Sequence, residues 1–134
     1  MLSYRVSARR IDHHGSLASA KQAEVVLDTD IAGRDDAFNP VELLLAALAA
    51  CMIKGIERVG PMIHFQYEAV EVTLEAIRQD VPPRIIEIRY ELKVATDETD
   101  QRLDLLHTNV QKYGTIFNTL AASTPINGSI GRLI

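Results

Sequence analysis

Apolar and polar residues alternate with a period of two in several parts of the chain, a pattern that predicts β-strands with one dry and one wet face. The first strand is expected within 4–11, and one or two returning strands within 16–28, after a turn at 12–15. Two longer strands are expected at 70–76 and 86–94. The Pro-containing segment between these two strands favours an antiparallel hairpin.

Between these two groups of strands the pattern changes to that of a helix. Asn39 is suited to the N-cap, Pro40 to the first helical position, and Glu42 to the third position of a capping box. Gly60 and Pro61 are typical of a helix end, so a helix is predicted over 40–59.

A second helix is predicted after Thr99 and up to about Tyr113, because apolar residues recur there at helical spacing. A further short helical turn is expected at 115–122, and 125–133 is expected to form a short closing strand or a tail. The order of strands and helices indicates an α+β fold.

The first helix is unusually apolar. Apart from Glu42, every residue from Val41 to Ile53 is apolar or Cys, so three turns have no polar face and need cover nearly all round. One sheet covers one side only, and an identical chain is the simplest source of a second layer, so we expect a homodimer with this helix near the interface. In the alternative, a monomer, the second helix and the C-terminal tail would cover it.

Composition limits the class of protein. The 134 residues are 47% hydrophobic and 24% charged, which is typical of one globular domain over 1–134. The net charge of −4 argues against non-specific nucleic-acid binding, which depends on neutralising phosphates. The longest uncharged apolar run has about half the length of a membrane span, and no signal sequence is visible, so we expect a cytoplasmic protein that binds no membrane.

One cysteine and four histidines exclude an internal disulfide and the usual zinc-site spacings. We expect no metal and no cofactor. His13 and His14 lie in a predicted turn without further ligands nearby, and a solvated turn explains them.

The single thiol, Cys51, lies in the middle of the first helix. Ala47 and Gly55 flank it at i−4 and i+4, and these small residues leave room beside the sulfur for a ligand or for a partner's backbone. A free Cys in such a helix often serves only as a small core residue. A reactive thiol would need a cation or hydrogen-bond donors nearby, and Lys54 is the one cation close to it on this helix.

The segment FNPVELLLAALAACMIKGIERVG (38–60) resembles the central helix of the OsmC/Ohr family, the osmotically inducible protein C and organic hydroperoxide resistance proteins. The segment YGTIFNTL (113–120) resembles the second motif of that family, and the order of elements also agrees. The resemblance implies antiparallel sheets wrapped around a central apolar helix, in an intertwined homodimer with two sites at the interface.

The resemblance also implies a thiol peroxidase chemistry, in which one Cys attacks a hydroperoxide and a second Cys resolves the resulting sulfenic acid. Cys51 matches the attacking Cys, whereas Gly114 stands at the position of the resolving one. Val41 replaces the Glu of the family's site. Glu42, one residue later, is a candidate for the same role, although the capping box already explains it.

The family's Arg comes from the first strand pair. Arg10 is the preferred candidate, because alternation places it on the inward face, and Arg9 and Arg34 are the other two. We therefore expect a divergent member of the family with a candidate catalytic set of Cys51, Arg10 and Glu42.

Three functions stay open on the sequence alone. The first is reduction of a small organic hydroperoxide by Cys51 with an external thiol reductant. The second is non-catalytic binding of a small apolar ligand at the dimer interface, with Cys51 in the pocket wall. The third is a protein-interaction module, for which the sequence identifies no surface.

Overall fold

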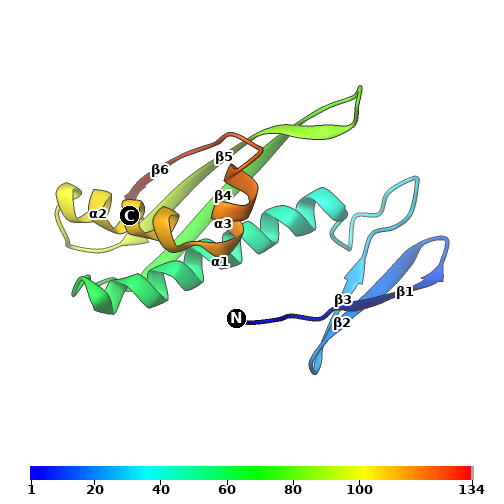
Figure 1. The fold of residues 1–134 in the computed structure, drawn as a ribbon, viewed down its shortest axis with the longest axis horizontal. Coiled ribbons are helices and arrows are strands. Elements are labelled where there is room, and N and C mark those ends of the chain that lie inside the picture. The colour runs from blue at the N-terminus through cyan, green and yellow to red at the C-terminus, as the bar shows by residue number, and fades with distance from the viewer. Residues whose placement is uncertain (134) are drawn as a thin grey trace. The chain divides into compact units, whose positions relative to one another are not determined.

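The protein is described by a computed structural model that covers residues 1–133 (Figure 1). Two compact units, Met1–Leu44 and Leu45–Ile134, can be distinguished along the chain. The elements in order are β1 (Ser7–Asp12), β2 (Gly15–Ala20), β3 (Ala23–Leu27), α1 (Pro40–Met62), β4 (Ala69–Gln79), β5 (Arg84–Ala95), α2 (Asp100–Tyr113), α3 (Thr115–Ala121) and β6 (Ile126–Arg132). The predicted α+β class is confirmed, and the predicted single domain stays a prediction.

The first unit contains a three-stranded antiparallel sheet in the order β1–β2–β3. All six residues of β1 and four of the five residues of β3 are exposed. Ala18 on β2 is the one buried hydrophobic residue among the described residues of this unit. The sheet therefore has almost no apolar core within its own unit.

The second unit contains a mixed sheet in the order β4–β5–β6. The predicted hairpin is confirmed, since β4 and β5 pair antiparallel, but β6 pairs parallel to β5. The sheets are thus antiparallel apart from this last strand, whose pairing the sequence did not predict. The reason is the crossover: α2 and α3 lie between β5 and β6 in the chain and return it to the starting end of β5, as a parallel pair requires.

A bulge between Ile77 and Arg78 shifts the register at the outer end of the hairpin, where Arg78 pairs with Ile85. Ile86 was expected on the dry face with Ile88, but its side chain is exposed and Ile85 packs against the core instead. The alternation rule fails here because an extra residue in one strand reverses the facing of the residues beyond it.

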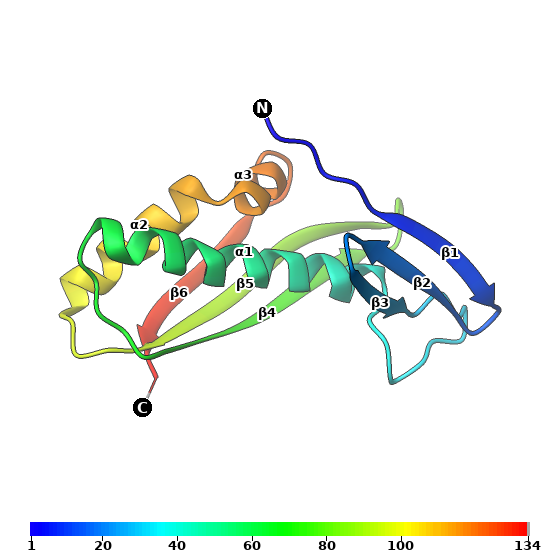
Figure 2. The same cartoon turned by 90° about the horizontal axis from the view of Figure 1, so that it is seen from below.

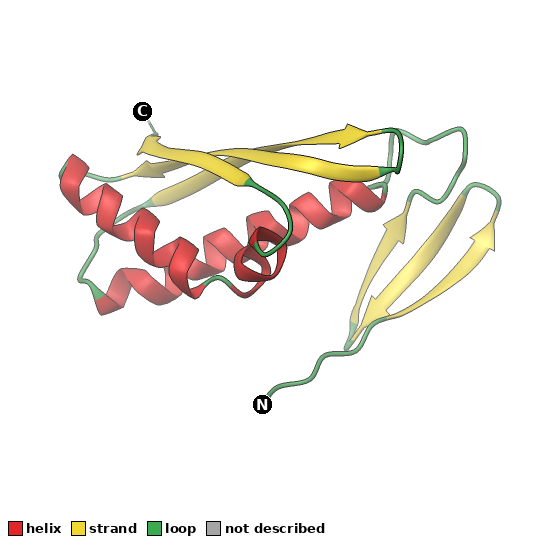
Figure 3. Cartoon of the chain, turned by 45° about the horizontal axis from the view of Figure 1, so that its top comes forward, coloured by secondary structure: helices red, strands yellow, loops and turns green. Residues whose placement is uncertain are grey.

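The apolar core lies between one face of the β4–β5–β6 sheet and the helices α1 and α2, which run along that face (Figures 2 and 3). The buried members from α1 are Leu48, Met52, Ile56 and Val59, followed by Phe65 in the segment between α1 and β4. Strand β5 contributes Ile88, Tyr90, Leu92 and Val94, and α2 contributes Leu103, Leu106 and Val110. These are the faces that periodicity predicted for β5 and α2.

Helix α1 ends at Met62, three residues beyond the predicted end at Val59, and contains Pro61 in its last turn. Proline fits helical φ but has no N–H, so the Glu57 carbonyl lacks its usual donor one residue before the helix ends. Carbonyl groups at this end are satisfied by other groups: Gly60 O accepts from Phe65 N at 2.8 Å, and Ile63 O accepts from the Arg102 guanidinium.

Helix α1 is not covered on all sides within one chain. Leu48 and Met52 are buried, but Ala47, Ala50 and Ile53 are exposed, the last at 37%. These three residues follow one another at i, i+3 and i+6 and form a strip of small and apolar side chains. The second unit therefore leaves this strip uncovered, and the expected homodimer stays a prediction.

Candidate functional site

Cys51 lies in the middle of α1, on its fourth turn, as a free, half-buried thiol. Its neighbours on the same helix face differ in exposure: Gly55 is buried, and Ala47 is exposed. A Cβ built on Gly55 would contact the Val110 side chain at 3.4 Å, so α2 packs closely on α1 one turn beyond the thiol. The small residues predicted to make room beside Cys51 therefore serve, at Gly55, the approach of α2.

Gly114, between α2 and α3, lies directly beside the sulfur. A Cβ built at this position would lie 3.2 Å from Cys51 Sγ, and 3.1 Å from both the Phe117 Cβ and the Val110 carbonyl oxygen. The backbone at Gly114 has φ −81° and ψ 114°, which any residue can adopt. Glycine is thus favoured here by space and not by conformation, because a Cβ would need its neighbours to shift by a few tenths of an ångström.

No hydrogen bond to Cys51 Sγ is formed within residues 1–133, and Lys54, the cation expected nearby, is exposed. The thiol therefore has Gly114 against it and no charged group bonded to it. A charge that activates it has to come from a substrate, a partner chain, or a rearrangement of these side chains.

Glu42 forms the capping box that the sequence predicted. Its backbone N–H donates to Asn39 Oδ1 and its carboxylate accepts from Asn39 N–H, each at 2.9 Å. The carboxylate is exposed. A helix-capping role accounts for this residue, and its role in a catalytic site stays a prediction.

The three arginine candidates differ in their surroundings. Arg9 and Arg10 pair in register with Leu17 and Ser16, on a strand that is exposed at every position. The expected inward face for Arg10 is therefore not formed by this unit.

Arg34 is already engaged. Its Nε and NH2 groups donate to the two oxygens of Asp36 at 2.6 and 2.9 Å, and NH1 donates to the His14 carbonyl oxygen at 3.4 Å. Beside this guanidinium the pKa of Asp36 falls to about 2. These bonds use three of the five N–H groups of Arg34, which leaves one N–H on each terminal nitrogen.

The histidine pair lies in the turn between β1 and β2. His14 Nδ1 lies 2.7 Å from Asp30 Oδ2, and this hydrogen bond lowers the pKa of Asp30. Within residues 1–133 no group of three or more His, Cys, Asp or Glu side chains is placed to hold a metal ion.

A cluster of three polar side chains lies between β5 and α2, and the sequence analysis did not predict it. Tyr90 OH lies 2.5 Å from His107 Nε2, and Gln111 Nε2 donates to Tyr90 OH at 2.6 Å. Burial is the main cause that raises the pKa of Tyr90 and lowers that of His107. The available signal was the i, i+4 spacing of His107 and Gln111 beside the apolar stripe of α2.

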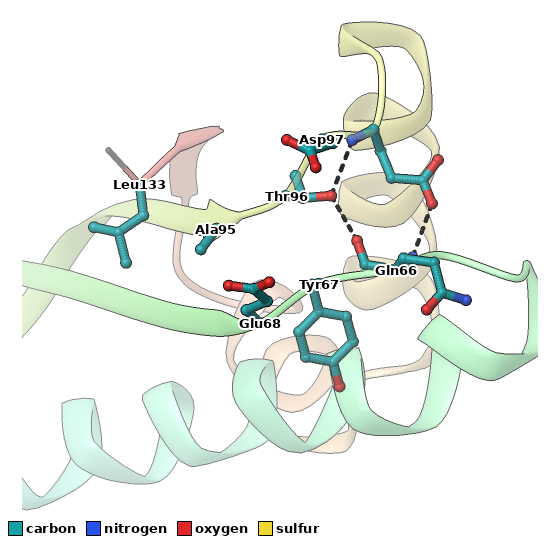
Figure 4. A pocket seen from close by; sticks show the side chains of 8 residues that line it. Gln66, Tyr67, Glu68, Ala95, Thr96, Asp97 and Leu133 are labelled. Carbon is teal, nitrogen blue, oxygen red and sulfur yellow. Dashed lines mark hydrogen bonds between the residues drawn. The ribbon is translucent and has the colours of Figure 1, made fainter.

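A cavity of about 590 Å³ lies at the ends of β4 and β5, in the second unit (Figure 4). Its walls include Tyr67, Glu68, Asp97 and Leu133, and none of the predicted site residues. Two of its polar groups bond to each other, since Gln66 N–H donates to Glu98 Oε2 at 2.8 Å. The cavity is therefore separate from the candidate thiol site.

No helix in residues 1–133 combines the length and the apolar character that crossing a bilayer requires.

Comparisons with known proteins agree on one family. The family model for OsmC-like proteins matches residues 33–128, and no curated protein sequence matches the chain. An OsmC-like protein from Mycoplasma pneumoniae has the same fold, with a TM-score of 0.89, 19% identity and coverage of 99% of both chains. An organic hydroperoxide resistance protein OsmC from Legionella pneumophila has a TM-score of 0.72 and 16% identity over 98% of both chains.

A third structure, the organic hydroperoxide resistance protein OhrB of Bacillus subtilis, has a TM-score of 0.72 and 12% identity, over 97% of this chain and 98% of that one. At these identities the structures show the fold, while the family model spans more than half of the sequence. The resemblance read from the two motifs is confirmed: this chain belongs to the OsmC-like protein family.

Proposed function

We propose that the protein reduces organic hydroperoxides through Cys51, with an external thiol as the reductant. The observation that carries this proposal is the placement of the half-buried Cys51 sulfur beside Gly114, in a member of a family that includes hydroperoxide resistance proteins. The site has one thiol and no second sulfur with which to form an internal disulfide.

The proposed reaction has three balanced steps. The Cys51 thiolate attacks the terminal oxygen of the hydroperoxide, the O–O bond breaks, and the alkoxide takes a proton and leaves as an alcohol. The resulting sulfenic acid reacts with one external thiol to give a mixed disulfide and water. A second external thiol attacks this disulfide, which restores the Cys51 thiol and releases the reductant as its own disulfide.

We further propose that the active form is a homodimer, for two reasons. The β1–β3 sheet exposes apolar residues such as Ile11, Val25 and Val26. Helix α1 exposes the strip that contains Ile53. Burying these surfaces against an identical chain would remove both from water, and the partner chain is then a possible source of Arg10 for the thiol.

Sedimentation velocity tests the dimer. We expect a species of twice the chain mass, which Ile53→Glu shifts toward the monomer, since a charge at a dry interface is costly. Ile31→Glu, in the exposed loop before α1, is the control and leaves the mass unchanged. A wild-type chain that sediments as a monomer would contradict this part of the proposal.

A sulfenic-acid probe tests the chemistry. After addition of tert-butyl hydroperoxide, the wild-type protein should bind a dimedone-type probe at Cys51 faster than free cysteine does, and Cys51→Ser should bind none. Arg10→Lys should slow the labelling if this guanidinium holds the peroxide oxygen by paired hydrogen bonds. Labelling no faster than that of free cysteine refutes the peroxidase proposal.

A second function is favoured by one observation: no donor or cation bonds to Cys51 Sγ within residues 1–133. In this alternative the protein binds a small apolar ligand at the dimer interface, and the thiol is part of the wall. Cys51→Ala would then leave binding of an apolar fluorescent probe nearly intact. The peroxidase function, unlike this alternative, depends on recycling by an external thiol. Such recycling requires a reducing compartment, which agrees with the expected cytoplasmic location.

A further inference from the structure

The hydrogen-bonded cluster of Tyr90, His107 and Gln111 connects the sheet to α2. Tyr90 is 5% exposed, so its hydroxyl needs partners inside the protein. It receives a hydrogen bond from the Gln111 side-chain amide at 2.6 Å and lies 2.5 Å from His107 Nε2. Because the amide is the donor to the hydroxyl, the hydroxyl can donate its own proton to His107 Nε2 when that nitrogen carries no proton.

The ring of Tyr90 is held in place from the opposite side by β6. Tyr90 pairs in register with Gly128. A Cβ built on Gly128 would lie less than 3.0 Å from three atoms of the ring. The absence of a side chain at this position allows the ring to lie against the β6 backbone, so its hydroxyl has little freedom to move away from α2.

The same cluster reaches the candidate thiol site through the main chain of Gln111. The Gln111 carbonyl oxygen accepts from Gly114 N–H at 3.4 Å, at the end of α2. Gly114 in turn lies against Cys51, with a built Cβ 3.2 Å from Sγ. Gln111 is therefore bonded to the sheet by its side chain and to the residue beside the sulfur by its backbone.

We propose that Tyr90, His107 and Gln111 are positioning residues for the thiol site, and that their hydrogen bonds fix the distance between the α2–α3 junction and Cys51. None of the three contacts the sulfur, so they act through Gly114. This inference rests on the proposed function for its biological meaning, but its structural content can be measured without any peroxide.

A second cysteine at position 114 provides the measurement. In a disulfide, each Cβ lies about 3 Å from the opposite sulfur, and the built Cβ at 114 lies 3.2 Å from Cys51 Sγ. Gly114→Cys should therefore form an internal disulfide, as two thiols are oxidised and one oxidised glutathione is reduced to two glutathione molecules. The equilibrium constant in glutathione buffers reports how closely residue 114 is held to Cys51.

In the Gly114→Cys background, we expect Tyr90→Phe to lower this equilibrium constant about three- to tenfold, the range of one lost net hydrogen bond. Gln111→Met, which keeps the chain length and the helix preference, should have a similar effect. Tyr67→Phe is the matched control, because Tyr67 lines the separate cavity at the ends of β4 and β5 and is not part of the Tyr90 cluster. In the Tyr67→Phe control, the equilibrium constant of the disulfide should stay within twofold of the value for Gly114→Cys alone.

Circular dichroism shows that each variant is folded, and mass spectrometry shows that the disulfide is internal. If Tyr90→Phe does not fold, Gln111→Met on the half-buried face of α2 carries the test. The proposal is overturned if the folded variants match the parent equilibrium constant within twofold, or if Gly114→Cys forms no disulfide with Cys51. A negative sulfenic-acid result with intact positional coupling would refute the peroxidase alone.

Discussion

Gly128 on β6 offers the sharpest test of the packing between the sheet and α2. The residue is exposed, and substitutions at exposed positions usually change stability by less than about 0.5 kcal/mol. Yet an added Cβ would lie under 3.0 Å from atoms of the Tyr90 ring, whereas ordinary contacts begin at 3.4 Å. Gly128→Ala therefore forces the ring to retreat by more than the 0.4 Å difference between these two values.

The cost has two sources. Overpacking a well-filled site costs about 1–3 kcal/mol. A displaced ring also moves its hydroxyl away from His107 Nε2 and from Gln111 Nε2, and each lost hydrogen bond costs about 1 kcal/mol. A gain of up to about 1 kcal/mol from reduced freedom of the unfolded chain offsets part of this. We expect Gly128→Ala to lower the free energy of unfolding by about 2–4 kcal/mol.

Urea unfolding at one fixed protein concentration measures this change. Gly131 on the same strand is the matched control, because a Cβ built there meets no atom within 4 Å, and Gly131→Ala should be neutral or slightly stabilising. In a Tyr90→Leu background, the cost of Gly128→Ala should fall, since the ring that it displaces is absent. A change below 0.5 kcal/mol for Gly128→Ala in the wild-type chain would refute this account of the Tyr90 ring.

Three further predictions follow from burial, capping and ionisation. Leu48→Ala should destabilise by about 2–5 kcal/mol in urea unfolding, because Leu48 is fully buried; an effect under 1 kcal/mol would contradict its place in the core. Thr99→Ala should cost about 1 kcal/mol by the same assay, since Thr99 Oγ1 accepts from Arg102 N–H at 3.2 Å. Burial lowers the pKa of His107 in the folded state, so the unfolded chain binds more protons and stability falls as the pH drops below about 6.5. Between pH 7.5 and 5.5 the urea midpoint should therefore fall further in the wild type than in His107→Gln, and equal falls would contradict this pKa shift.

The elements that local chemistry determines were predicted well. The start of α1 followed from Asn39 and Glu42, whose reciprocal hydrogen bonds are both formed. The cap at Thr99 and the hairpin β4–β5 were also correct. Features that depend on tertiary context were not predictable in the same way. The parallel pairing of β6 depends on the path of the chain through α2 and α3, and the exposure of Ile86 depends on a bulge in its own strand, where it is the extra residue.

In the candidate site, too, the features that depend on tertiary context could not be predicted from local sequence patterns. Periodicity alone gave no reason to place Gly114 beside Cys51; only the resemblance of 113–120 to a family motif did so. The Tyr90–His107 contact joins residues 17 positions apart and exists only because β5 and α2 face each other. Alternation placed Arg10 on an inward face, but alternation does not say what covers that face, and β1 is exposed throughout.

The glycine at position 114 decides how a reactive Cys51 would behave. A second sulfur at this distance would capture a sulfenic acid at once, because the effective concentration of a group held beside its target is very high. With glycine there, the sulfenic acid persists until an external thiol arrives, or until more peroxide oxidises it to the sulfinic acid. A catalytic protein should therefore lose activity when hydroperoxide is in excess over thiol and be protected when thiol is in excess. A protein that only binds an apolar ligand should show no dependence of binding on this ratio.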